Sequence, residues 1–191
     1  MAYLCIDIET GGSHITKHPI ISIGTCLVDK FHKEKRRFTF DFDINQFEKK
    51  CWDNFWSKNQ HVLSILSRDK KCTLESFMQY IDDLDLKYNN NVIIISDNVA
   101  FDIAFINYAL DKYLNRSGLN YKSNGKYRMI TDQNSFLWAY MPEYRENWIR
   151  DDDVIKKFNL SISTHKDHLP DNDAEQILDM ILPLIKIKIW E

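Results

Sequence analysis

Hydrophobic and polar positions follow two periods along the chain, and their succession predicts a sheet whose first three strands precede the helices. Apolar or alternating runs indicate five strands, at 2–8, 19–28, 36–43, 92–95 and 127–130. In the third of these, Phe38, Phe40 and Phe42 alternate with polar residues, which is typical of a strand with one exposed face. The short connections between the first three strands favour antiparallel pairing.

A period of three to four residues indicates helices between and after the later strands. The predicted helices lie at 52–66, 73–84, 101–114, 135–140 and 171–187. Thr73 has the residue type of an N-cap, with Glu75 in the first turn that follows. Strands separated by helices pair in parallel, so the expected fold is of the α/β class, with a mixed five-stranded sheet flanked by helices.

Length and composition predict an ordinary folded domain. Its 191 residues are 44% hydrophobic and 28% charged, which predicts a single domain over 1–191 that needs no disulfides for stability. The sequence contains no run of about 18 apolar residues, so a membrane span is not expected. The N-terminus is interpreted as the start of the folded domain. The formal net charge is -3, so contact with nucleic acid would need local basic patches or metal ions held by carboxylates.

The cysteines predict a reducing environment. Cys5, Cys26, Cys51 and Cys72 form no CxxC pair and have no histidine at zinc-ligand spacing. Because Cys5 and Cys26 lie in apolar strand runs, we expect buried free thiols and a cytoplasmic or other reducing intracellular location.

Two acids at the end of the first strand are the first candidates for chemistry. Asp7 and Glu9 are two residues apart, so on a strand they share a face. Neighbouring carboxylates in a buried position repel each other and lose hydration. The pair is therefore either a solvated strand end or a site that holds a cation.

Two further motifs place polar residues at helix starts. In SDNVAFD, Asn98 is predicted to cap a helix and Asp102 lies in its first turn, where the helix dipole favours a carboxylate. In HLPDNDAEQI, His168 precedes a helix and Asp173 lies in its first turn, so both can face one pocket. Taken singly, these motifs are equally typical of a capped helix and of a surface loop.

Together and in this order, Asp-x-Glu, Asn-x3-Asp and His-x4-Asp resemble the DEDDh branch of the DnaQ-like 3′→5′ exonuclease superfamily. The matching residues are Asp7, Glu9, Asp102, His168 and Asp173. The flanking Thr10, Gly11, PIISIG and Phe101 also match, and the resemblance extends to Glu175. The Trp-rich segment CWDNFWSKNQ is similar to small phage- and virus-type, DexA-like members. The resemblance implies a ribonuclease H-like fold with strand order 3-2-1-4-5.

The resemblance also implies a two-metal phosphodiesterase. Two Mg²⁺ or Mn²⁺ ions about 3.5–4 Å apart suit the reaction, and such hard cations prefer oxygen ligands. The implied ligands are Asp7, Glu9, Asp102 and Asp173, with His168 deprotonating the attacking water. The expected substrate contacts are Thr10, Gly11, Asn98, Phe101 and Trp56.

Two positions depart from the pattern. Asp97 stands before Asn98, where such motifs often have histidine, and Gly12 stands where some relatives have an apolar wedge against the terminal base. Another residue must then stack on that base, and Trp56 and Trp52 are the candidates. A core position for Trp56 is the alternative.

The function expected from these features is hydrolysis from the 3′ end of single-stranded or frayed nucleic acid, releasing 5′-mononucleotides. A ribonuclease H-type endonuclease is less favoured, because those enzymes usually take the second acid from a helix. A catalytically silent nucleic-acid-binding or scaffold module is the other alternative. The sequence does not decide whether the substrate is DNA or RNA. It also leaves the oligomeric state open, and a homodimer is one of the alternatives.

Overall fold

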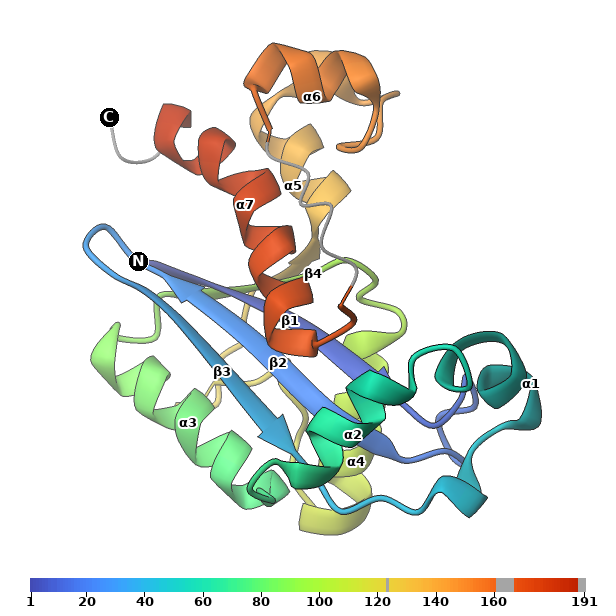
Figure 1. The fold of residues 1–191 in the computed structure, drawn as a ribbon. Coiled ribbons are helices and arrows are strands. Elements are labelled where there is room, and N and C mark those ends of the chain that lie inside the picture. The colour runs from blue at the N-terminus through green and yellow to red at the C-terminus, as the bar shows by residue number, and fades with distance from the viewer. Residues whose placement is uncertain (123, 161–166, 189–191) are drawn as a thin grey trace.

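The computed structural model describes residues 1–122, 124–160 and 167–188, and it is built around one five-stranded sheet in the order β3-β2-β1-β4-β5 (Figure 1). The strands are β1 (Ala2–Thr10), β2 (Ile20–Val28), β3 (Lys33–Thr39), β4 (Val92–Ser96) and β5 (Ile130–Asp132). β1, β2 and β3 pair antiparallel, whereas β4 pairs parallel with β1 and β5 parallel with β4. The predicted mixed sheet and strand order of a ribonuclease H-like fold are confirmed.

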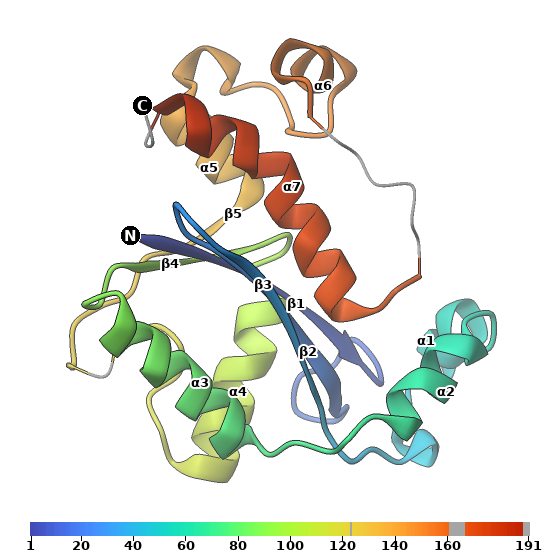
Figure 2. The same cartoon turned by 60° about the vertical axis from the view of Figure 1, so that its left-hand side comes forward.

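Helices cover both faces of this sheet (Figure 2). They are α1 (Lys49–Cys51), α2 (Gln60–Arg68), α3 (Leu74–Lys87), α4 (Asp102–Leu114), α5 (Gln133–Tyr140), α6 (Asp152–Phe158) and α7 (Pro170–Lys188). Two 3₁₀ turns, η1 (Ile44–Gln46) and η3 (Pro142–Tyr144), and one π-helical turn, η2 (Trp52–Trp56), complete the described elements. α3 and α4 lie against one face, and α5 and α7 against the other.

Alternation along β1 divides the core between these two faces. Leu4 and Ile6 are fully buried in the cluster that includes residues of α3 and α4. Tyr3 and Cys5 are fully buried in the cluster formed with α5 and α7. Because side chains alternate along a strand, Asp7 and Glu9 point to the α7 side.

Several predicted element boundaries are wrong, because contacts distant in sequence decide them. The strand expected at 36–43 is β3 at Lys33–Thr39, and the chain then leaves the ladder so that Phe42 packs with Phe47 beside η2. The single helix expected at 52–66 is interrupted between η2 and α2, and α6 was not predicted.

The strand predicted at 127–130 lies later, at β5, because the polar residue there points inward. Tyr127 and Met129 are exposed, whereas Arg128 is buried and pairs with the buried carboxylate of Asp85. The predicted cap of Thr73 on α3 is confirmed, since its hydroxyl accepts the backbone N–H of Ser76 at 3.2 Å.

The start of α7 lies directly on β2. A Cβ atom at Gly24 would be 1.9 Å from the backbone carbonyl carbon of Pro170, so only glycine allows this approach. Lys33 and Lys35 of β3 pair with Glu175 of α7 at 2.8 and 2.7 Å. Arg37 pairs with Asp171 at 2.7 Å, which adds a further link from β3 to the start of α7.

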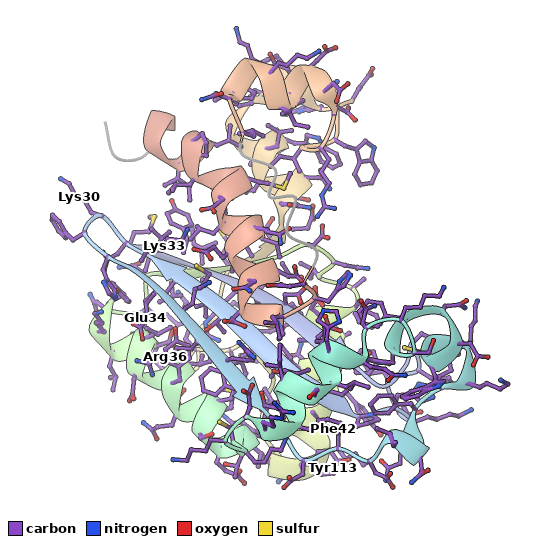
Figure 3. All side chains as sticks on the ribbon, viewed as in Figure 1. Lys30, Lys33, Glu34, Arg36, Phe42 and Tyr113 are labelled. Carbon is purple, nitrogen blue, oxygen red and sulfur yellow. The ribbon has the colours of Figure 1, made fainter. Side chains whose placement is uncertain are left out.

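Basic residues along β3 take part in ion pairs within the fold. Lys30, Lys33 and Arg36 follow the β2–β3 hairpin and its outer strand (Figure 3). Lys33 binds α7, and the Arg36 guanidinium pairs with Glu34 and lies over the Tyr80 ring. Lys33, Lys35 and Arg37 therefore fasten β3 to its neighbours through ion pairs. Among the described residues, no helix combines the length and the apolar character that crossing a membrane requires.

Candidate active site

The acids of β1 lie where the strand leaves the sheet, on the side covered by α7. Asp7 stands opposite Gly24 of β2 and Glu9 opposite Ser22, and the register shifts at a bulge between Glu9 and Thr10. Glu9 is 9% exposed and Asp7 is half-buried. Because Gly24 has no side chain, the backbone at the start of α7 can lie against β2 beside Asp7.

Asp102 enters the same region from the first turn of α4. It is 4% exposed, and its Oδ2 atom accepts the hydroxyl of Ser96 and the backbone N–H of Asn98, the latter at 3.3 Å. The predicted N-cap role of the Asn98 side chain is wrong. The N-cap position is Phe101, without a side-chain cap, and the Asn98 carbonyl accepts the backbone N–H of Asp102 at 2.8 Å. The Asp102 carboxylate itself therefore fixes the turn between β4 and α4.

His168 and Asp173 complete the group from the start of α7. His168 has a backbone φ of 53°, in the left-handed region, and α7 begins two residues later. Ligand atoms of Glu9, His168 and Asp173 all lie within 4.8 Å of one another. Residues from both ends of the chain are thus brought together at one site, in the geometry that a metal ion can use.

Burial and nearby acids raise the pKa values of all four carboxylates. Burial raises the pKa of Asp7 well above its usual range, and Glu9, Asp102, Asp173 and Asp97 raise it further. Burial also raises the pKa of Glu9, with added repulsion from Asp173 and Asp102. Burial raises the pKa of Asp102 to about 6 and that of Asp173 to about 6. A bound cation would offset both the burial and the repulsion that raise these pKa values.

The residues predicted to contact substrate beside β1 and α4 are placed at the edge of this cluster. The Thr10 hydroxyl donates to the Gly12 carbonyl at 2.9 Å, and the Gly11 carbonyl accepts the backbone N–H of Glu48 at 2.8 Å. Phe101 is half-buried, and its ring lies against that of Phe105 at a centroid separation of 4.8 Å. Their role in binding substrate stays a prediction.

Trp56 is a core residue, and the hypothesis that it stacks on a base is wrong for this structure. Its side chain is fully buried, and its indole N–H donates to the Thr10 carbonyl at 3.0 Å. The neighbouring Phe55 is half-buried instead, and its ring meets that of His168 edge-on at a centroid distance of 4.9 Å. The regular helical period predicted from Trp52 to Leu66 could not show which of these two aromatic residues is buried. The π-helical turn changes which residue points inward.

Comparison with known proteins places the chain in a family. The exonuclease family model RNase_T matches residues 4–181. The chain belongs to this exonuclease family. The family match spans the whole site, from Asp7 to Asp173, and supports the DnaQ-like resemblance. No curated protein matches the chain by sequence. The DexA-like subtype stays a prediction.

Solved structures of similar fold include exonuclease I from two bacteria. E. coli exonuclease I in complex with a 5cy-dT13 oligonucleotide matches with a TM-score of 0.59 and 15% identity, over 98% of this chain and 40% of that one. The zinc-bound E. coli ExoI–ssDNA complex gives 0.55 and 17%, over 98% and 41%. A moderately thermophilic exonuclease I from Methylocaldum szegediense gives 0.58 and 11%, over 100% and 41%. This exonuclease family chain thus spans about two fifths of those proteins.

Membership of the exonuclease family implies dependence on divalent metal ions, and the site fits that requirement. Asp7, Glu9, Asp102 and Asp173 offer the oxygen ligands that hard divalent cations prefer. Each has a raised pKa, so each stands to gain from a positive charge placed between them.

Proposed function

We propose that this chain is a 3′→5′ exonuclease that hydrolyses single-stranded or frayed nucleic acid and releases 5′-mononucleotides. The observation that carries the proposal is the approach of Glu9, His168 and Asp173 to within 4.8 Å at one end of β1. Asp102 and Asp173 lie close enough to raise the pKa values of both Asp7 and Glu9. A chain that had lost its activity would have little reason to retain this electrostatic cost. Residues 1–191 are proposed to act as a single exonuclease domain.

We propose that Asp7, Glu9, Asp102 and Asp173 hold two Mg²⁺ or Mn²⁺ ions, with Asp7 shared between them. When bound, such ions neutralise phosphate charge and lower the pKa of water. Glu9 and Asp173 would lie on the side of the attacking water, because both are within 4.8 Å of His168. His168 would accept a proton from that water. Asp102, fixed by Ser96 and Asn98, would lie on the leaving-group side.

Metal binding should appear in the stability of the protein as a function of pH. The pKa values of Asp102 and Asp173 rise from 3.8 in the reference state to about 6 in the folded protein. The folded state therefore binds more protons, and in EDTA the melting temperature should fall as the pH rises from about 4 through 6. Adding Mn²⁺ at neutral pH should raise it again, because the ion binds the folded state. A melting temperature that changes neither with pH nor on addition of Mn²⁺ would contradict the metal site.

The aromatic residue that we propose to stack on the terminal base is Phe55. It lies half-buried against His168, and aromatic faces bind single-strand bases without sequence preference. Its neighbour Trp56 provides the matched comparison, because that ring is fully buried.

Alanine variants separate these two roles. Phe55→Ala should weaken single-strand binding by about 1–3 kcal/mol, as expected for one stacked base. Trp56→Ala should instead lower the free energy of unfolding by about 3–5 kcal/mol through the lost core packing. Fluorescence anisotropy and urea denaturation measure the two quantities on both variants. Phe55→Ala with parental affinity would exclude the stacking role.

Single-stranded DNA is the substrate that we propose to test first, because the E. coli exonuclease I structures of similar fold contain single-stranded DNA. Matched DNA and RNA oligomers, each single- and double-stranded, should be incubated with Mg²⁺ or Mn²⁺ and with EDTA. We expect metal-dependent release of mononucleotides, fastest from single-stranded DNA. Binding without hydrolysis under every metal condition would favour the silent-module alternative.

The location that we propose is a reducing intracellular compartment. Cys5 and Cys26 stand opposite each other on β1 and β2, and both are free thiols. Burial raises the pKa of the Cys26 thiol to about 12, which disfavours the reactive thiolate.

A further inference from the structure

Arg150 forms an ion pair beside the site that none of the matched motifs includes. Its Nη2 atom lies 3.1 Å from Oδ2 of Asp97, and the Arg150 side chain is 59% exposed. The other carboxylate oxygen of Asp97 accepts the side-chain amide of Gln133. Asp97 is the residue that departs from the histidine often found before Asn98, so the chain has an acid–arginine pair at this position.

The charges of this pair reach the candidate catalytic carboxylates. The positive charge of Arg150 lowers the pKa of Asp173, in opposition to burial. The negative charge of Asp97 raises the pKa values of Asp7, Asp102 and Asp173. Geometry gives the same placement, because Asp97 lies between Ser96 and Asn98, which both donate hydrogen bonds to the Asp102 carboxylate. The Arg150–Asp97 pair therefore flanks the acid cluster.

The backbone next to Arg150 is anchored, while its side chain is not buried. Ile149 is fully buried, and its backbone N–H donates to Oδ1 of Asn134 at 2.9 Å. The indole N–H of Trp138 in α5 donates to the carbonyl of Asn147 at 2.8 Å. The turn between η3 and α6 is thus held against α5, and it presents the Arg150 guanidinium to solvent beside the acids.

We propose that Arg150 binds a backbone phosphate of the strand in the active site, exchanging Asp97 for the phosphate when substrate enters. This inference rests on the proposed function and adds a phosphate-binding residue to it. Exposed ion pairs contribute little to stability, so Asp97 can be displaced without a large penalty. The planar guanidinium can donate two hydrogen bonds to one phosphate, which gives it an advantage over lysine.

The test is the salt dependence of strand binding. Binding of a fluorescein-labelled oligothymidylate is measured in Ca²⁺ over a series of salt concentrations for the parent, Arg150→Ala, Arg150→Lys and Arg145→Ala. Arg145 is the matched control, because it is an exposed arginine on the same segment. Arg150→Ala should raise Kd about tenfold or more, as expected for the loss of one charge-assisted pair. It should also reduce the slope of log K against log salt by about 0.7, the value for one phosphate contact on a single strand.

Arg150→Lys should restore the slope and only part of the affinity, and Arg145→Ala should match the parent. Asp97→Asn separates phosphate binding from a purely structural ion pair. If the pair only supports the fold, Asp97→Asn and Arg150→Ala should weaken binding equally. If Arg150 binds phosphate, Asp97→Asn should keep or improve the affinity, because the guanidinium is released.

An unchanged Kd and slope in Arg150→Ala, with a parent that hydrolyses the strand, would overturn this inference alone. A parent that hydrolyses no strand with any metal would contradict the proposed function instead. Melting temperatures of all four variants identify any loss that comes from unfolding.

Discussion

Asp7→Asn should abolish hydrolysis while the protein stays folded. The family resemblance assigns Asp7 the position shared between the two metal ions, and Glu9, Asp102 and Asp173 all raise its pKa. Metal ions contribute several kcal/mol to such reactions, so the rate should fall by about a thousandfold or more. In EDTA the melting temperature should be equal or higher, because the substitution removes one charge from a crowded group.

Asp41→Asn is the matched control for this substitution. Asp41 is an exposed aspartate beyond the end of β3, and the change also removes one negative charge. Its hydrolysis rate should equal that of the parent. If Asp7→Asn instead retains activity within tenfold of the parent, the assignment of the metal ligands is wrong.

His168→Ala should cut turnover by about 10²–10⁴-fold, the usual contribution of a general base. Divalent ions lower the pKa of water themselves, so the histidine accelerates the reaction without being the sole source of the nucleophile. His168 lies within 4.8 Å of Glu9 and Asp173, which places it on the side where we expect the attacking water. Metal binding should persist because the four carboxylates remain, and stabilisation by Mn²⁺ measures this independently of turnover.

His61→Ala controls for the loss of an imidazole. His61 is exposed on α2 and should be silent when replaced. His165 lies outside the described residues, and its alanine variant tests the register of the third motif. Damage from His165→Ala together with a silent His168→Ala would show that the register is wrong.

The parts of this fold that were predictable are those where one local pattern decides the structure. β1 and β4 are buried on both faces, so their apolar runs mark them directly. Asp7 and Glu9 interrupt the first of these runs at its end, and a spacing of two on a strand already puts them on one face. Asp102 and Asp173 lie in the first turns of their helices as predicted, although Asn98 does not cap α4.

The parts that were missed depend on partners distant in sequence. Trp56 is held by the carbonyl of Thr10, and Arg128 is buried because Asp85 pairs with it. The sequence around Arg128 shows only a polar residue between two apolar ones, which predicts the opposite orientation. Phe55 and Arg150 approach the site through irregular backbone, one from a π-helical turn and one from the turn before α6, and no periodic pattern identifies such positions.

The polarity and product of hydrolysis test the central claim most directly. A single-stranded oligomer is labelled at its 3′ end in one reaction and at its 5′ end in another, and both are followed with Mg²⁺ or Mn²⁺, with EDTA, and with Asp7→Asn. A 3′→5′ exonuclease should release the 3′ label at once as a labelled mononucleotide, while the 5′-labelled strand shortens stepwise. EDTA and Asp7→Asn should stop both reactions. Internal fragments from either strand, or release of the 5′ label first, would contradict the account.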